Sequence, residues 1–398
     1  MNMLMKIEDT LECVIDNRGK TPPIADEGNC LLEINCIANK GKFPDYGAVK
    51  KHVTEETYST WFRAGHPKKG DILIPTVGTL DAIGYMDRDD CCIAQNLIAF
   101  RTKKDVCNSE YLFYLLCNPI IRMRLLNLNI GGVQPSIKVP HLKKLEVEIP
   151  PLDIQEKIVA ILHALDEKIA VNEQINRNLL EQTEALFKSW FEDFEPWNGI
   201  MPENWKQGVL GDFVTIKRGG SPRPIQEFLS DDGLRWLKIS DVSGLQSPYI
   251  LDIAEHIIEA GLKKTVHLGE GALVLSNSAT PGIPKILDVD SCIHDGWLYF
   301  PESQLSNYFL FLFFKSIRSN LVALGNGSVF TNLKTDILKN YSFSKPDIDT
   351  LNQFDELVTP MFVAMREVAR ENHYLSELRD SLLPKLMSGE LDISDLDI

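Results

Sequence analysis

This 398-residue chain contains an internal repeat, and that repeat constrains its fold more than any other feature. A shift of 196 positions brings Lys138 onto Lys334 and Pro150 onto Pro346. The junctions EIPPLDIQEKIVAIL and YSFSKPDIDTLNQFDELV share one order: alternating apolar residues, proline, aspartate and then a helical apolar period. A period of about 200 residues is too long for a solenoid repeat. We therefore predict a duplicated unit of one globular domain followed by one long helix.

Each globular part is predicted to mix α and β structure. Short apolar runs such as ILIP (72–75), LIAF (97–100) and ALVLS (272–276) have the length of buried strands, and longer apolar stretches follow them. Asn118 and Pro119 have the residue types of an N-cap and a first-turn proline, so we expect a helix to begin there.

The two long helices each have apolar residues at alternating spacings of four and three, which predicts a coiled-coil seam. Polar breaks fall at repeat-related positions, Asn176 with Asn372 and Thr183 with Arg379. We expect the helices to pack on each other, and not only each on its own domain, because the seam runs for about 60 Å at 1.5 Å per residue. Pro360 predicts either a kink or a helix start nearby. The seam residues chosen are Ile158, Leu165, Asn176, Leu179, Leu186, Phe354, Met361, Asn372, Leu375 and Leu382.

The distribution of charge is more informative than the formal net charge of −15. Most of the excess acid lies in residues 152–195 and 346–398, where the helices are predicted. Residues 111–145 and 303–335 contain no Asp or Glu but several Lys and Arg. The negative total therefore does not exclude a polyanionic partner.

Two kinds of loop recur in both halves and could contact DNA. Each half has an Arg-Gly loop, NRGKTP and KRGGSPRP, and a glycine loop, NIGGVQPSIK and GNGSVFTNLK. Gln, Asn, Ser and Arg can read base edges, and Lys and Arg neutralise phosphates. Ordinary surface turns remain the alternative interpretation. The candidate DNA-binding residues are Arg18, Lys20, Gln134, Ser136 and Lys138 in the first half, and Arg218, Arg223, Ser328, Asn332 and Lys334 in the second.

No catalytic or metal site is predicted. Residues 19–21 resemble the end of a phosphate-binding loop, but Val14 stands where its first glycine is needed. Residues 166–168 match a loose nuclease pattern, but a solvated helix face explains them better. The histidines have no metal-ligand spacing. The cysteines form no C-x-x-C pair and no apolar run reaches 18 residues, so reduced thiols, a cytoplasmic location and no membrane contact are expected.

The chain resembles the specificity subunits of type I restriction-modification enzymes. The resemblance rests on SIKVPHLKKLEVEIPPLDIQEKIVAIL, on NRNLLEQTEALFKSWF and on LSELRDSLLPKLMSGELDIS, and it covers the whole chain. It implies an α+β fold of two mixed target-recognition domains, separated by two long antiparallel coiled-coil helices with pseudo-two-fold symmetry. The implied divisions are 1–150 and 198–345 for the domains, 151–197 for the central helix, and 346–398 for the second helix with its acidic tail.

The same resemblance implies a non-catalytic subunit that binds double-stranded DNA. Two modification subunits would dock on it and supply S-adenosylmethionine and adenine-N6 methylation. Restriction subunits would supply the ATP- and Mg-dependent nuclease, so no cofactor is expected in this chain. A coiled-coil scaffold that binds only proteins is the alternative from another class, and a stand-alone enzyme is a third.

Overall fold

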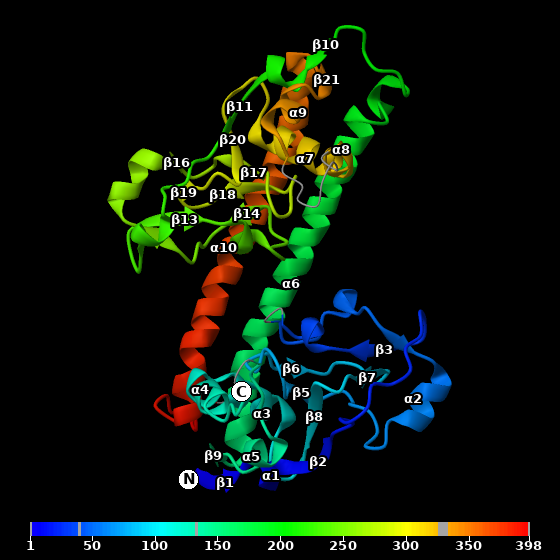
Figure 1. Ribbon diagram of the computed structural model, residues 1–398, viewed down its shortest axis with the longest axis vertical. Coiled ribbons are helices and arrows are strands. Elements are labelled where there is room, and N and C mark those ends of the chain that lie inside the picture. The colour runs from blue at the N-terminus through cyan, green and yellow to red at the C-terminus, as the bar shows by residue number, and fades with distance from the viewer. Residues whose placement is uncertain (1, 39–40, 132–133, 325–332, 397–398) are drawn as a thin grey trace. The chain divides into compact units, whose positions relative to one another are not determined.

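The computed structural model describes residues 2–38, 41–131, 134–324 and 333–396 of the chain. The chain divides into two compact units, both drawn in Figure 1. Unit 1 comprises residues 1–167 and 376–398, and unit 2 comprises residues 168–375. Each unit therefore contains one globular domain and a segment of each long helix.

The domain of unit 1 contains a four-stranded sheet in the order β2-β8-β5-β6 and a three-stranded sheet in the order β4-β3-β7. The pairings are antiparallel except that β3 runs parallel to β7. The first strand pairs with the strand just before the first long helix, with Met3 opposite Ile149. The strands are β1 Met3–Lys6, β2 Leu11–Ile15, β3 Asn29–Leu32, β4 His52–Val53, β5 Ile72–Pro75, β6 Gly84–Tyr85, β7 Cys91–Ile93, β8 Leu97–Thr102 and β9 Glu146–Ile149.

The helix α3 fills the core of this domain. The side chain of Asn108 caps it by accepting the backbone N–H groups of Glu110 and Tyr111, and its residues from Tyr111 to Leu116 are buried. Asn118 caps the next helix, with Pro119 in its first turn, as the sequence predicted. The helices of unit 1 are α1 Ile7–Thr10, α2 Glu55–Trp61, α3 Ser109–Cys117, α4 Pro119–Leu126 and α5 Val139–Lys143, with 3₁₀ turns η1 Ile34–Cys36 and η2 Tyr46–Ala48.

The domain of unit 2 repeats this topology, which confirms the predicted duplication. Its order β11-β20-β17-β18 matches β2-β8-β5-β6, with β14 added beside β18. Its second sheet, β12-β15-β13-β19-β16, again has one parallel pair, β13 with β19, and β10 pairs with β21. The strands are β10 Lys206–Val209, β11 Val214–Arg218, β12 Leu229–Ser230, β13 Leu234–Leu237, β14 Tyr249–Ile250, β15 His256–Ile257, β16 Val266–Leu268, β17 Leu273–Ser276, β18 Pro284–Leu287, β19 Ser291–Ile293, β20 Trp297–Ser303 and β21 Ser342–Lys345.

The helices of unit 2 keep the same places in the chain order, with α7 in the core. The side chain of Ser306 caps α7, and the residues from Phe309 to Phe314 are buried. The helices are α7 Asn307–Ser316, α8 Arg318–Leu324 and α9 Thr335–Lys339, and the 3₁₀ turns are η3 Glu195–Trp197, η4 Leu210–Asp212, η5 Ile225–Glu227, η6 Ile239–Val242 and η7 Glu259–Lys264.

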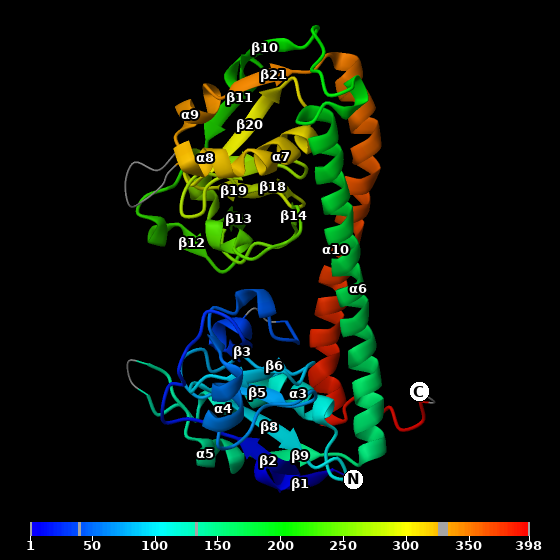
Figure 2. The ribbon, with the colours of Figure 1, turned by 90° about the vertical axis from the view of Figure 1, so that its right-hand side faces the viewer.

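The long helices are α6 Leu152–Phe191 and α10 Ile348–Ser388, and their segments lie side by side in each unit (Figure 2). In unit 2 they run antiparallel, because Asn172 contacts Asn372 whereas Phe187 contacts Phe354. The predicted pairing of the two helices is confirmed. The alternative, packing of the helices on their domains, is observed as well. Phe187 and Phe354 belong to one cluster with the core of α7.

The predicted seam residues differ in burial because that helix face is shared between the partner helix and the domain. Ile158 and Phe354 are fully buried. Phe362 and Leu383, one residue beyond predicted seam positions, are also buried. The remaining seam residues are partly buried: Leu165, Asn176, Leu179, Leu186, Met361, Asn372, Leu375 and Leu382.

The polar layers are not those that the repeat alone suggests. The side-chain amide of Asn172 donates to Asn372 Oδ1 at 2.8 Å in unit 2, and Arg379 pairs with Asp166 at 2.9 Å in unit 1. The buried Oδ1 of Asn176 has no hydrogen-bond partner among the residues described. Repeat-related positions do not face each other because an antiparallel partner is read in the opposite direction.

Pro360 lies inside α10, so the alternative that the second helix starts near it is wrong. The helix begins at Ile348, where the Asp347 carboxylate accepts the backbone N–H groups of Asp349 and Thr350. The hydrogen bonds from Thr350 hold the pKa of Asp347 below its usual range. This cap fixes the helix start twelve residues before the proline.

Candidate nucleic-acid interface

In unit 1 the strand register gathers several loops at one edge of the four-stranded sheet. Ile15 at the end of β2 lies opposite Ala99, and Pro75 at the end of β5 lies opposite Leu97 at the start of β8. The loop after β2, the turn after β5 and the turn before β8 therefore meet at this edge. We call these segments, residues 16–20, 76–78 and 94–96, the loop edge of unit 1.

The glycine loop is tied to the same edge. The backbone N–H of Ile137 donates to Thr76 O at 2.9 Å, and that of Gly78 donates to Pro135 O at 2.9 Å. Gly131 is required there, because a Cβ at its position would lie 1.9 Å from Gln134 O. The structure thus brings the candidates Gln134, Ser136 and Lys138 to the loop edge, with Gln134 and Lys138 exposed and Ser136 partly buried.

Arg18 is held by a neighbouring carboxylate. Its Nε and Nη2 both donate to Asp16, each at 2.7 Å, and this contact holds the pKa of Asp16 below its usual range. Asn17 fixes the loop through hydrogen bonds to the backbone of Ala64 and Gly65. Arg18 and Lys20 are both exposed.

The loop edge of unit 2, residues 218–224, 277–280 and 294–296, has the same construction. Arg218 lies opposite Leu298 and Ser276 lies opposite Trp297, so the corresponding strand ends meet. Gly219 allows its loop to pass close to the turn before β20, where a Cβ would lie 2.3 Å from His294 O.

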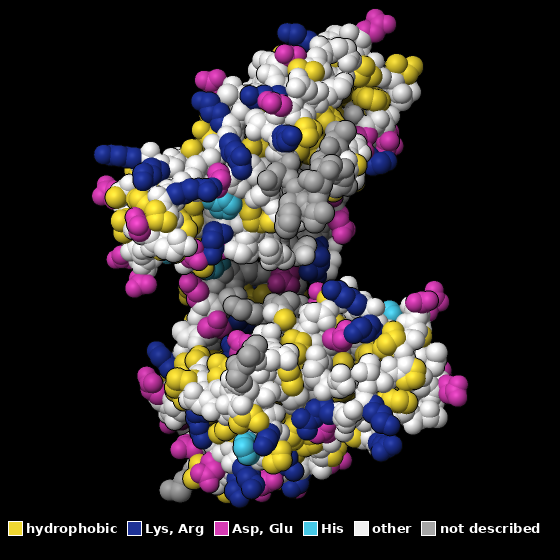
Figure 3. All heavy atoms as spheres, viewed as in Figure 1, with side chains coloured by type: hydrophobic (Ala, Val, Ile, Leu, Met, Phe, Trp, Pro, Cys, Tyr) yellow, Lys and Arg dark blue, Asp and Glu magenta, His cyan; other side chains and the backbone are white. Residues whose placement is uncertain are grey.

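Asp295 is the hydrogen-bond acceptor that the polar side chains of this edge share. It accepts Ser221 Oγ at 2.6 Å and Arg223 Nη2 at 3.2 Å, and its backbone carbonyl accepts Arg218 Nε. The hydrogen bond from Ser221 holds the pKa of Asp295 below its usual range, and the two arginines add to the effect. The candidates Arg218 and Arg223 thus lie together on one carboxylate. In the view of Figure 3, Lys and Arg side chains gather over β11, β16 and β19 of unit 2.

The remaining candidates belong to the glycine loop of unit 2. Leu333 N donates to Asn277 O at 2.8 Å, which is the counterpart of the contact between Ile137 and Thr76. Lys334 follows and is exposed. Ser328 and Asn332 lie outside the described residues.

The turn before β8 in unit 1 and before β20 in unit 2 was not among the predicted DNA-binding segments. This turn contains Gln95 in unit 1 and His294 and Asp295 in unit 2. Aligning CCIAQNLIAF with SCIHDGWLYF would have located it as a variable position between matched strands.

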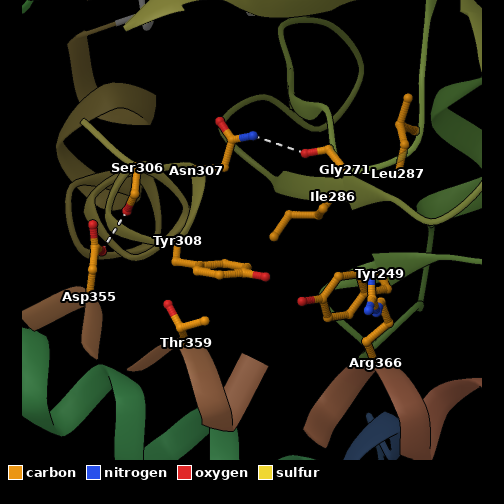
Figure 4. Close-up of a pocket in the computed structure, with 10 residues that line it drawn as sticks. All are labelled: Tyr249, Gly271, Ile286, Leu287, Ser306, Asn307, Tyr308, Asp355, Thr359 and Arg366. Carbon is orange, nitrogen blue, oxygen red and sulfur yellow. Dashed lines mark hydrogen bonds between the residues drawn. The ribbon is translucent and has the colours of Figure 1, made fainter. Parts of the chain in front are cut away.

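The cavity drawn in Figure 4 lies away from the loop edge, between the domain of unit 2 and α10. It has a volume of about 310 Å³. Ser306 Oγ donates to Asp355 at 2.6 Å, and the hydroxyl of Tyr249 donates to Phe362 O at 3.0 Å. Burial raises the pKa of Asp355. These groups hydrogen-bond within the chain, so the cavity is part of the joint between domain and helix.

Over the described ranges, no group of three or more His, Cys, Asp or Glu side chains is placed to hold a metal ion. None of the helices in those ranges is both long and apolar enough to cross a membrane. The eight cysteines are unpaired.

The fold thus defines a duplicated chain of two mixed α/β domains, each with one loop edge, and two long helices that contribute a segment to both units. The model of the type I restriction modification DNA specificity domain matches twice, at residues 24–181 and 202–356. The chain therefore belongs to the type I restriction-modification specificity family.

Similar proteins agree with this assignment. The type I restriction enzyme MjaIX specificity subunit of Methanocaldococcus jannaschii is 25% identical, over 87% of this chain and 83% of its own. The HindI specificity subunit of Haemophilus influenzae is 24% identical, over 81% of this chain and 87% of its own. The crystal structure of the S subunit from M. genitalium has the same fold, with a TM-score of 0.55, 16% identity and coverage of 97% and 96%.

Proposed function

We propose that this chain is the DNA-reading subunit of a type I restriction-modification complex and that each domain reads one half of a bipartite duplex site. The observation that supports this most strongly is that the same loop edge is built twice from the same strand ends. The backbone N–H of Ile137 donates to Thr76 O after β5, and that of Leu333 donates to the equivalent Asn277 O after β17.

The side chains on the two edges differ, which supports an asymmetric site. Gln95 stands in unit 1 where Asp295 stands in unit 2. Arg18 has its own carboxylate partner, whereas Arg218 and Arg223 share one. Two edges with different donors and acceptors select different base edges.

The partner subunits are proposed to dock on the long helices and to supply the chemistry. In unit 2 these helices expose apolar side chains, namely Val171, Ile175, Leu357, Val363 and Tyr374. Exposed apolar side chains on a charged helix pair favour protein contacts. The proposed subunit performs no reaction itself, and S-adenosylmethionine, ATP and Mg²⁺ belong to its modification and restriction partners.

The test is a genome-wide map of methylated adenines in cells that make this chain together with its modification subunit. We expect one motif with two defined halves and an undefined spacer, absent when either protein is omitted. If methylation occurs without sequence preference, or if the complex forms without preference for any duplex, the chain is a protein-binding scaffold instead.

A further inference from the structure

A cavity opens at the loop edge of unit 2. Its volume is about 750 Å³, within the usual range of small-ligand sites. It lies between the loop that contains Arg223 and the turn at Ser278 and Ala279. Its walls are mainly apolar and include Pro222, Pro224, Ile225, Trp236 and Ile239.

His294 supplies a donor to this cavity. Burial lowers its pKa, so the ring is neutral at pH 7. Its Nδ1 accepts the backbone N–H of Gly296 at 2.7 Å. The ring proton of the neutral tautomer therefore lies on Nε2. The cavity combines mainly apolar walls with the His294 ring, the hydroxyls of Ser221 and Ser278, and the ion pair of Lys238 with Glu255.

The equivalent wall of unit 1 has different residues. Trp236 corresponds to Leu31, because the backbone N–H of each donates to the residue just before the neighbouring strand, β15 or β4. His294 corresponds to Ala94, each directly after the strand that runs parallel to its neighbour. The aromatic ring and the N–H donor are therefore specific to unit 2.

Ala279 gives a second sign of specialisation. It lines the cavity with a φ of 57°, in the left-handed region that side chains with a Cβ rarely adopt. Its counterpart in unit 1 is Gly78, with a φ of 91°. The two units therefore differ at this position of the cavity wall as well.

We propose that this cavity takes one nucleobase that is displaced from its stack in the half-site of unit 2. The inference rests on the proposed function. The apolar walls accept the face of a base, and the ring N–H of His294 binds one of its acceptor atoms. The side chain of Arg223, 78% exposed, lies at the mouth, where the backbone phosphate of a displaced nucleotide would pass.

The experiment uses the full chain in complex with its modification subunit, on a duplex with the mapped site. In the half-site of unit 2, 2-aminopurine replaces each purine in turn, and permanganate oxidation reports unstacked pyrimidines. We expect one position, other than the adenine that is methylated, to become unstacked on binding. The same scan in the half-site of unit 1 is the internal control.

Three variants assign that signal to the cavity. Leu229→Trp, at a rim position that is 41% exposed, fills the entrance and should abolish the signal. His294→Ala installs the alanine of unit 1 and should weaken specific binding about tenfold. Ala279→Gly installs the glycine of unit 1, leaves the entrance open and should keep the signal.

The outcomes separate this inference from the function on which it rests. If the complex binds the mapped site specifically but no base in this half-site unstacks, the cavity inference is wrong and the proposed function stands. If a base unstacks equally in Leu229→Trp and His294→Ala, it enters another site and the inference is again wrong. If no sequence-specific binding exists at all, both fail.

Discussion

At the scale of single residues, the arginines of both loop edges are held by carboxylates. Asp16 holds Arg18 in unit 1, and Asp295 holds Arg218 and Arg223 in unit 2. A guanidinium fixed in this way loses less conformational freedom when it binds. A base or phosphate must then share the guanidinium with the carboxylate or replace it.

Base contacts and phosphate contacts are distinguishable by their effects. Arg218→Ala is expected to cost about 1–3 kcal/mol on the specific duplex and to relax one position of the site. Lys334→Ala is expected to weaken all duplexes alike and to reduce the salt slope by about one. Titrations of the complex on specific and scrambled duplexes at several salt concentrations measure both. The control is Lys206→Ala, on β10 outside the loop edge, and an equal effect of all three substitutions would contradict the assignment.

Lys285 predicts a pH dependence of stability. It is buried on β18, donates to Leu245 O at 2.7 Å and to Ser247 O, and burial lowers its pKa to about 7. Between pH 7 and pH 10 the unfolded chain binds a proton that the folded chain does not. The free energy of unfolding should therefore rise with pH in this window, by up to about 1.4 kcal/mol per unit from this residue.

The variant Lys285→Met, with an unbranched apolar side chain, should lose that rise and should be more stable than the parent at pH 7. Denaturant unfolding of both proteins at pH 7, 8.5 and 10 measures the difference. Equal slopes in the two proteins would show that Lys285 keeps its ammonium form throughout the window.

At the scale of elements, the helix pair shows what a sequence can and cannot predict. The period of four and three residues predicted both helices, and the shared proline junction predicted the duplication. The facing partners could not be read from the repeat, because antiparallel pairing sets Asn172, and not Asn176, against Asn372. The cavity wall was also beyond prediction, since Trp236 and His294 are separated by 58 residues and meet only through the parallel pairing of β13 with β19.

If the helices set the distance between the two readers of the proposed function, a change in helix length should change the spacer of the DNA site. A copied heptad inserted in each helix where the two units divide, after Glu167 and after Leu375, keeps the seam phase and the contacts within each unit. It lengthens each helix by about 10 Å at 1.5 Å per residue. At about 3.4 Å per base pair this is up to three base pairs.

We expect the insertion variant to methylate the same half-sites with a spacer one to three pairs longer, or to lose activity if the groove phase cannot be recovered. Methylation mapping decides between the outcomes. Full activity on the original spacing would mean that the helices serve only for partner docking. Inserting the heptad in α6 alone is the control, and it should disrupt the pairing.

At the scale of the whole molecule, the proposed function needs one chain to read two different half-sites, and the duplicated fold offers one domain for each. Each half keeps the same sheet order and the same backbone hydrogen bond, from Ile137 to Thr76 and from Leu333 to Asn277. The side chains on the two edges have diverged, as Gln95 and Asp295 illustrate. One scaffold can therefore present two independent specificities, and independence of the halves is the central claim.

The most direct measurement is a methylation map after residues 1–150 are replaced by the matching domain of a family member with a different target. The account predicts that one half of the methylated motif changes to that of the donor, while the other half and the spacer stay as they were. A motif that changes in both halves, or in neither, would contradict the two-domain account.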